Sequence, residues 1–259
     1  MSASSILVTL FAYILRWYIR TQGGVSEVGL YTAGFVILNT YVGMIFTAMS
    51  TDYYPRLASV NNDNEQCRIV INQQGEIALL LLAPIIISCI LFIPYIIRLV
   101  YSEEFLPAQN YILIAVVGMM FKVASWVISY SFLAKAESRL FIVNEFIASS
   151  YCLILNMIGY RLGGLTGLGL SYLITYFVYF VQVFVIAKKR YDFRFSSSFV
   201  KIYGVQLVIV FLSFAIMKLW LSSWAYLPSS ILFVCCCAFS FFELDKRLKF
   251  MEQVKKMMV

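Results

Sequence analysis

The chain has 259 residues, of which 62% are hydrophobic and 17% aromatic, and its mean hydropathy is +0.85. Soluble domains contain only about 45–50% apolar residues, so this composition excludes an ordinary soluble domain and indicates an integral membrane protein. The net charge of +7 does not call for a nucleic-acid partner, because basic residues beside an anionic membrane surface account for it.

The apolar runs predict an all-α, polytopic transmembrane helix bundle with about eight spans. A helix of about 20 apolar residues crosses a hydrocarbon core of roughly 30 Å. The candidate spans are separated by short polar breaks and lie near residues 4–20, 29–49, 77–97, 108–133, 140–160, 165–187, 200–220 and 225–242. The glycine-rich start of the sixth span, RLGGLTGLGL, permits close helix packing or a bend.

Lysine and arginine are concentrated in every second connection between the predicted spans. If the amino terminus faces the cytoplasm, the cytoplasmic parts are residues 50–76, 134–139, 188–201 and the basic tail from Glu243. The opposite side then holds only five basic residues, Arg16, Arg20, Arg98, Arg161 and Lys218. Cytoplasmic loops carry an excess of positive charge, so this pattern predicts that both termini are cytoplasmic.

The longest of these polar segments, residues 50–76, has a helix start signal of its own. Asp63 is followed three residues later by Gln66, which is typical of a side chain that caps a helix amino terminus. We predict a helix that begins here at the membrane interface and runs into the third span. A solvated loop is the alternative.

The residue inventory offers no catalytic or metal chemistry, and we expect no enzyme activity, metal or cofactor. The chain has no histidine, the commonest acid–base group near neutral pH and the commonest ligand for transition metals. None of its six cysteines forms a C-x-x-C pair, so they are interpreted as small buried side chains. Reversible palmitoylation of the 235–237 run is a weaker alternative.

Two charged residues lie inside apolar runs. Lys122 is in the middle of VGMMFKVASWVISY, where an ammonium costs roughly 2.5–3.5 kcal/mol unless it faces water or a partner. It either faces a cavity or extends its long stem toward the membrane surface. Glu145 lies near the start of the fifth span. It could pair with Lys122, line a cation or proton pathway, or lie at the level of the headgroups.

Arg16 and Arg20 form a basic pair at the far end of the first span. They are four residues apart and therefore share one face of a helix, and guanidinium groups bind phosphate through paired hydrogen bonds. The alternative is an interfacial anchor beside Trp17 and Tyr18. The amides Asn39, Asn156 and Gln182 are interpreted as hydrogen-bonding partners between helices.

Three patterns together resemble a known family. They are VGLYTAGF followed by a span and the YPRLA exit at residues 54–58, the basic and aromatic first span YILRWYIR, and the G-x-x-G-L-G-L start at residues 164–170. In this order and spacing they are similar to bacterial polysaccharide flippases. Within the multidrug/oligosaccharidyl-lipid/polysaccharide exporter superfamily, they most resemble the O-antigen translocases.

The resemblance implies a transporter of the bacterial inner membrane that moves undecaprenyl-diphosphate-linked O-antigen or polysaccharide units outward by alternating access. It implies Arg16, Arg20 and Lys122 as cavity cations and Glu145 as a coupling or pairing residue. Complete members have roughly twelve to fourteen spans, so residues 1–190 are expected to correspond to a six-helix second lobe and residues 191–259 to two additional helices with the basic tail. The expected partners are lipid-linked oligosaccharide, membrane lipid, and a first lobe or a second copy.

Two other classes of function stay open. A multidrug or cation exporter of the same superfamily would share the helices, but it should carry more intramembrane acids than Glu145 alone. A membrane-embedded transferase of polysaccharide synthesis would need a catalytic carboxylate at the membrane face, for which Glu103 and Glu104 are the candidates.

Overall fold

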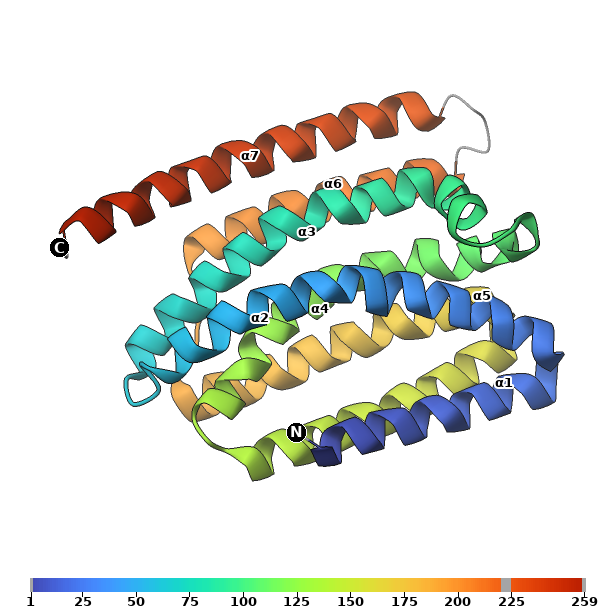
Figure 1. Cartoon of the computed structure of the whole chain (residues 1–259), viewed down its shortest axis with the longest axis horizontal. Coiled ribbons are helices and arrows are strands. Elements are labelled where there is room, and N and C mark those ends of the chain that lie inside the picture. The colour runs from blue at the N-terminus through green and yellow to red at the C-terminus, as the bar shows by residue number, and fades with distance from the viewer. Residues whose placement is uncertain (1, 220–224, 258–259) are drawn as a thin grey trace.

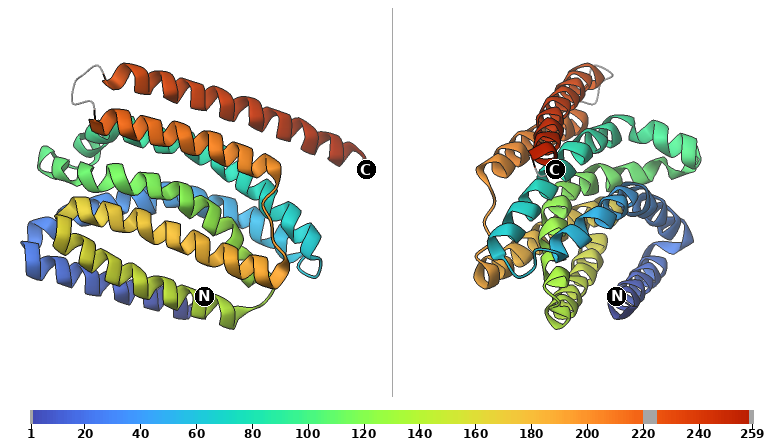
Figure 2. Two further views of the ribbon diagram at one scale, coloured as in Figure 1. Left: turned by 180° about the vertical axis from the view of Figure 1, so that it is seen from behind. Right: turned by 60° about the vertical axis from the view of Figure 1, so that its left-hand side comes forward.

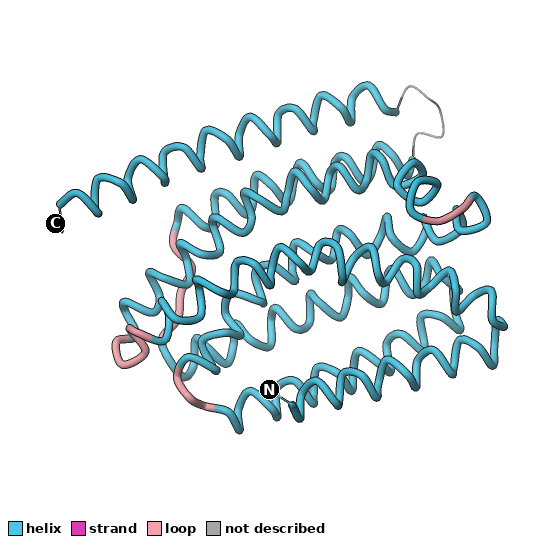
Figure 3. Tube along the Cα trace, in the orientation of Figure 1, coloured by secondary structure: helices cyan, strands magenta, loops and turns pink. Residues whose placement is uncertain are grey.

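The computed structural model describes residues 2–219 and 225–257, and this part of the chain is helical throughout, with short loops at the ends of the helices (Figures 1 and 3). The predicted all-α polytopic bundle is therefore confirmed. The helices are α1 (Ser2–Val36), the π-helix η1 (Ile37–Tyr41), α2 (Val42–Ala58), α3 (Asn64–Val100), the 3₁₀-helix η2 (Glu103–Ala108), α4 (Gln109–Ala134), α5 (Ser138–Tyr191), α6 (Ser197–Leu219) and α7 (Tyr226–Met257). Residues 220–224, the first of which ends the seventh predicted span, lie outside the described residues.

Two of the long helices fold back on themselves at glycine. The backbone of Gly24 in α1 has φ 82°, and that of Gly164 in α5 has φ 55°, a region that side-chain-bearing residues seldom adopt. In α5 the Tyr179 hydroxyl donates a hydrogen bond to Glu145 Oε1, although 34 residues of straight helix would separate them by about 50 Å. Figure 2 shows both helices as hairpins.

These reversals divide two of the long helices into two straight parts each, which we call legs. Six helices of the described chain are long and apolar enough to cross a membrane. Because α1 with α2 contains one reversal and α5 contains another, six continuous helices give eight legs. The predicted breaks between residues 20 and 29 and between residues 160 and 165 therefore fall on Gly24 and on Gly163–Gly164.

The connections that the sequence assigns to one side of the membrane also meet at one end of the bundle. Lys135 Nζ donates to the carbonyl oxygen of Asn61 at 2.6 Å, which joins the α2–α3 turn to the α4–α5 turn. Arg190 at the end of α5 forms an ion pair with Glu137 at 2.9 Å. This end, at the left of Figure 1, carries most of the basic residues, so the charge asymmetry of the sequence is an asymmetry of the folded bundle.

An ionic cluster at the same end fastens the last helix to the rest of the bundle. The guanidinium of Arg247 in α7 donates to Glu76 Oε2 of α3 at 2.9 Å and to Ser198 Oγ of α6 at 3.0 Å. It also donates to Glu243 Oε2 at 2.6 Å. We call Glu76, Ser198, Glu243 and Arg247 the ionic node. Glu76 and Arg247 are 171 positions apart, and no sequence pattern predicts that they pair.

The predicted cap at Asp63 is confirmed, and it determines where α3 begins. The Asp63 carboxylate accepts hydrogen bonds from the backbone N–H groups of Glu65, at 2.8 Å, and Gln66, at 3.2 Å. From this point α3 continues without interruption through Pro84 and Pro94 to Val100.

We expect Asp63→Ala to lower the free energy of unfolding by about 1 kcal/mol, because two backbone donors lose their acceptor. Thermal unfolding of the purified protein in detergent measures this change. Asn62→Ala, at an exposed position in the same turn, is the matched control. An equal effect of the two substitutions would show that the cap contributes nothing specific.

Candidate functional site

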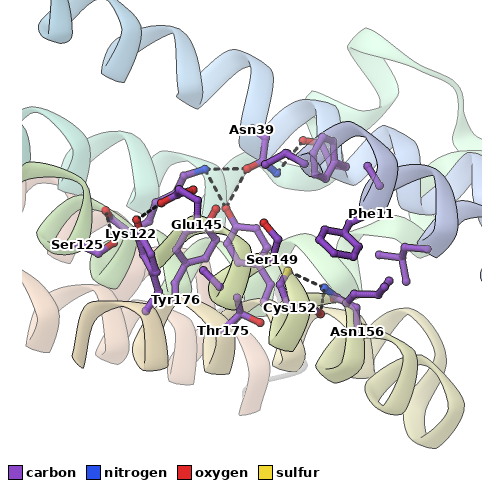
Figure 4. Close-up of a pocket in the computed structure, with 18 of the residues that line it drawn as sticks. Phe11, Asn39, Lys122, Ser125, Glu145, Ser149, Cys152, Asn156, Thr175 and Tyr176 are labelled. Carbon is purple, nitrogen blue, oxygen red and sulfur yellow. Dashed lines mark hydrogen bonds between the residues drawn. The ribbon is translucent and has the colours of Figure 1, made fainter. Parts of the chain in front are cut away.

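A cavity of about 420 Å³ lies among α1, η1, α4 and both legs of α5. This volume is within the range of about 300–1,000 Å³ that is usual for sites that bind small molecules. Figure 4 shows most of the side chains that line it. The cavity contains both charged residues that the sequence placed inside apolar runs, Lys122 and Glu145.

The helical repeat of each wall explains which residues reach the cavity. On α4, Lys122, Trp126 and Tyr130 are spaced four residues apart and line the cavity together, as residues on one helical face do. The second leg of α5 contributes a stripe of the same kind, made of Tyr172, Thr175, Tyr176 and Tyr179. The first leg contributes Glu145, Ser149, Cys152 and Asn156.

Lys122 is held inside the bundle by polar and aromatic partners. Its ammonium donates to Asn39 Oδ1 at 2.8 Å and lies 3.5 Å from the Tyr172 hydroxyl. It also lies 5.0 Å from the ring centroid of Tyr176 and 5.9 Å from that of Phe46, within the range of cation–π attraction. The side chain thus ends at the cavity.

A widened helical turn presents the Asn39 amide to Lys122. Asn39 is the central residue of η1, where the backbone N–H of Val42 bonds to the carbonyl oxygen of Ile37. Single π-turns within longer helices often occur at functional sites. The Asn39 amide group also donates to the carbonyl oxygen of Phe35 at 3.3 Å, so the orientation of its oxygen toward Lys122 is fixed (Figure 4).

Glu145 lines the cavity but has a different partner from Lys122. Its carboxylate accepts from the Tyr179 hydroxyl. Among the described residues, the two charges do not form an ion pair with each other. The cavity therefore contains one acid and one base that are each hydrogen-bonded to the protein and both present at its wall.

An aromatic cluster forms part of the cavity wall on α4. The Trp126 ring centroid lies 5.2 Å from those of Phe46 and Tyr130, and 5.6 Å from that of Tyr53. The buried Tyr53 hydroxyl donates to the carbonyl oxygen of Val127 at 2.6 Å. These contacts hold Trp126 and Tyr130 in place while both remain half-exposed and line the cavity.

The two arginines of the first leg lie in different environments. Arg16 is half-buried, with its guanidinium carbon 5.8 Å from the ring centroid of Phe35, a residue that lines the cavity. Its Nε is buried and has no hydrogen-bonding partner among the described residues. Arg20 is exposed. The structure thus places Arg16 behind the cavity wall and Arg20 on the surface.

The predicted interhelical amides give a mixed result. Asn39 and Gln182 do join helical legs, Gln182 by donating to Asn144 Oδ1 at 2.7 Å. For Asn156 the prediction was wrong, because its amide donates to the carbonyl oxygen of Cys152 one turn earlier in the same leg, at 2.8 Å. The candidate acids of a transferase, Glu103 and Glu104, are exposed in η2 and do not line the cavity.

Comparisons with known proteins agree with this architecture. Residues 1–110 match the model of a family described as "Polysaccharide biosynthesis protein". The solved structure titled "Lipid II flippase MurJ, inward closed conformation" superposes with a TM-score of 0.58 at 17% sequence identity, over 89% of this chain and 51% of the flippase chain. The chain has a MurJ-like fold.

The match to a polysaccharide biosynthesis family agrees with the resemblance that the sequence motifs indicated, and the solved structure supports the fold that this resemblance implies. The chain spans about half the length of the solved flippase. Among curated proteins, none matches the sequence significantly.

Proposed function

We propose that the chain is part of an inner-membrane flippase that moves undecaprenyl-diphosphate-linked O-antigen or polysaccharide units to the periplasmic side. The observation that carries the proposal is a cavity with a lysine at membrane depth, in a chain that resembles a lipid-linked-substrate flippase in fold. An ammonium inside a membrane protein is costly and is usually kept for function. The proposed class is a transporter rather than an enzyme.

We assign a role to each of the four charged residues. Lys122 is the cation inside the cavity, where it contacts the substrate. Arg16 and Arg20 supply positive charge near the end of the first leg, where the substrate enters or leaves. Glu145 is the coupling residue, whose protonation or cation binding accompanies the change between inward and outward states. The basic end of the bundle faces the cytoplasm, in keeping with the positive-inside rule, and both termini are cytoplasmic.

The transport cycle requires a second wall for the cavity. The chain spans 51% of the solved flippase, and alternating access in such folds is a movement of one lobe against the other. We propose that a first lobe, on a separate polypeptide or a second copy of this chain, completes the cavity.

Complementation in a bacterial strain that lacks its O-antigen flippase tests this function. The chain is expressed alone and together with the coding region that precedes it. Surface polysaccharide that returns only with both parts supports a two-lobe flippase. No return under either condition, with a glycan matched to the source organism, contradicts the proposal.

In the complementing system we expect Lys122→Met to reduce surface polysaccharide at least tenfold, because the variant keeps the length of the side chain but loses the charge. Lys122→Arg should retain more transport than Lys122→Met. Lys218→Met, which removes an exposed lysine of α6, is the matched control. Surface polysaccharide at the unaltered level in the Lys122→Met variant would show that Lys122 is not part of the site.

A cation exporter is the second candidate, and the position of Glu145 on the cavity wall is what favours it. Lys122 in the same cavity opposes it, because its ammonium would repel a cationic substrate. Export of a lipophilic cation that Glu145→Gln abolishes and Lys122→Met increases would favour the exporter over the flippase.

A further inference from the structure

The cavity combines flat aromatic surfaces with hydrogen-bonding groups of both charge signs. We propose that it is a binding site for a single pyranose ring, so that it recognises the sugar of the transported molecule rather than its diphosphate. That the ligand is a sugar is argued from the cavity alone. That this sugar belongs to a transported lipid-linked molecule rests on the proposed flippase function.

Three other ligand classes fit the lining less well. A lipid tail cannot form hydrogen bonds with the polar groups of the cavity lining, which include Asn39, Lys122 and Glu145. A diphosphate would find one ammonium in the cavity and would be repelled by the carboxylate of Glu145. A cationic ligand would be repelled by Lys122. A sugar tolerates both charges, because its hydroxyl groups both donate and accept hydrogen bonds.

The aromatic stripe of α4 offers the surface on which a sugar ring can stack. The C–H bonds on one side of a pyranose carry small positive charges and are attracted to the negative face of an aromatic ring. Trp126 and Tyr130 lie one helical turn apart on the cavity wall, and their centroids are 5.2 Å from each other. Trp126 packs against Phe46 and Tyr53, and Tyr130 packs against Tyr53, so both rings are held in place before any ligand arrives.

The polar groups around this surface retain hydrogen-bonding capacity. The Lys122 ammonium has three donors, and Asn39 and Tyr172 are its two hydrogen-bonding partners among the described residues. The Glu145 carboxylate has about four acceptor positions, one of which accepts from Tyr179. Lys122 can therefore donate to a hydroxyl or to the carboxylate of a uronic acid, and Glu145 can accept from hydroxyl groups.

Saturation-transfer NMR with the full chain in lipid nanodiscs tests the proposal directly. The probes are methyl glucoside, methyl glucuronide and inorganic pyrophosphate, each added alone and the last also in competition. We expect the methyl glycosides to bind with dissociation constants on the order of 1 mM, with stronger saturation of the ring protons on one face of the sugar. Pyrophosphate should not displace them.

Variants identify the site that gives the signal. Trp126→Leu should weaken sugar binding about tenfold through loss of the stacking surface, and Trp17→Leu, at an exposed position of α1, should leave it unchanged. If Trp126→Leu proves unstable, Glu145→Gln tests the same site without removing the aromatic wall and should weaken binding measurably. Retained affinity in a folded Trp126→Leu protein and in Glu145→Gln would overturn the assignment.

The outcome separates this proposal from the flippase function. Sugar binding without complementation would keep the sugar site and refute the flippase. Complementation without any glycoside signal, or with glycosides displaced by pyrophosphate, would refute the sugar site and leave the flippase in place.

Discussion

Gly167→Val is expected to lower the free energy of unfolding by about 3 kcal/mol or more, because it forces apart two closely packed helical legs. Gly167 lies where the two legs of α5 cross. Even a Cβ atom at this position would overlap the carbonyl group of Gly159 in the opposite leg, and two helix backbones cannot separate locally without losing contacts along the hairpin. Ser171 secures the same crossing, with its hydroxyl 2.7 Å from the carbonyl oxygen of Leu155 and 2.9 Å from that of Gly167.

The effect of Gly167→Val is measured by denaturant unfolding in detergent and by the fraction of protein that elutes as a monodisperse species. Gly204→Val is the control, because a Cβ atom at Gly204 of α6 would meet nothing within 4 Å. Similar unfolding curves for the two variants would mean that the legs of α5 do not pack as closely as the structure shows.

The second large effect is expected at the ionic node. Arg247→Met should lower the free energy of unfolding by about 3 kcal/mol, because it leaves the carboxylate of Glu76 without its counter-charge. Glu243 keeps its ion pair with Lys246 at 3.1 Å. The side chains of Glu76 and Arg247 are only 11% and 19% exposed, so water can compensate little. Glu76→Gln should lower the free energy of unfolding by less, since Arg247 keeps its ion pair with Glu243 at 2.6 Å.

A double-mutant cycle isolates the interaction across the node. The variant with both Glu76→Leu and Arg247→Met should be more stable than Arg247→Met alone, because no unpaired charge of α3 then faces α7. Hydrogen exchange along α7 shows where stability is lost. Additive effects of the two single substitutions would mean that Arg247 and Glu76 do not interact in solution.

The legs of the fold could be predicted from the sequence because each has its own hydrophobic run and its own break. The reversals at Gly24 and Gly164 fall within the predicted breaks, and both breaks contain glycine pairs. The Asp63 cap depends only on residues that are neighbours in the sequence, so it could be predicted as well. The ionic node could not be predicted, since Glu76 and Arg247 are far apart in the sequence and each is an ordinary charge at the end of an apolar run.

The site could be predicted only in part, and for a similar reason. Lys122 and Glu145 are exceptional as charges within apolar runs, which is why a position at a cavity or polar pathway was among the alternatives predicted for each. The hydrogen bonds of Lys122 with Asn39 and Tyr172 could not be predicted, because they depend on how three helices pack together. The aromatic stripe carried no signal in a chain that is 17% aromatic, although the four-residue spacing of Lys122, Trp126 and Tyr130 could have revealed a shared face.

The π-turn at Ile37–Tyr41 has a consequence for comparing this chain with its relatives. A π-turn holds one residue more than the α-helical turn it replaces, so it can be gained or lost by the insertion or deletion of a single codon. A relative with one residue fewer between Gly34 and Gly43 would have a regular α-helix there, and the side chain aligned with Asn39 would point about 100° away from the cavity. A one-position gap in this stretch therefore separates sequences with an amide beside the lysine from sequences without one.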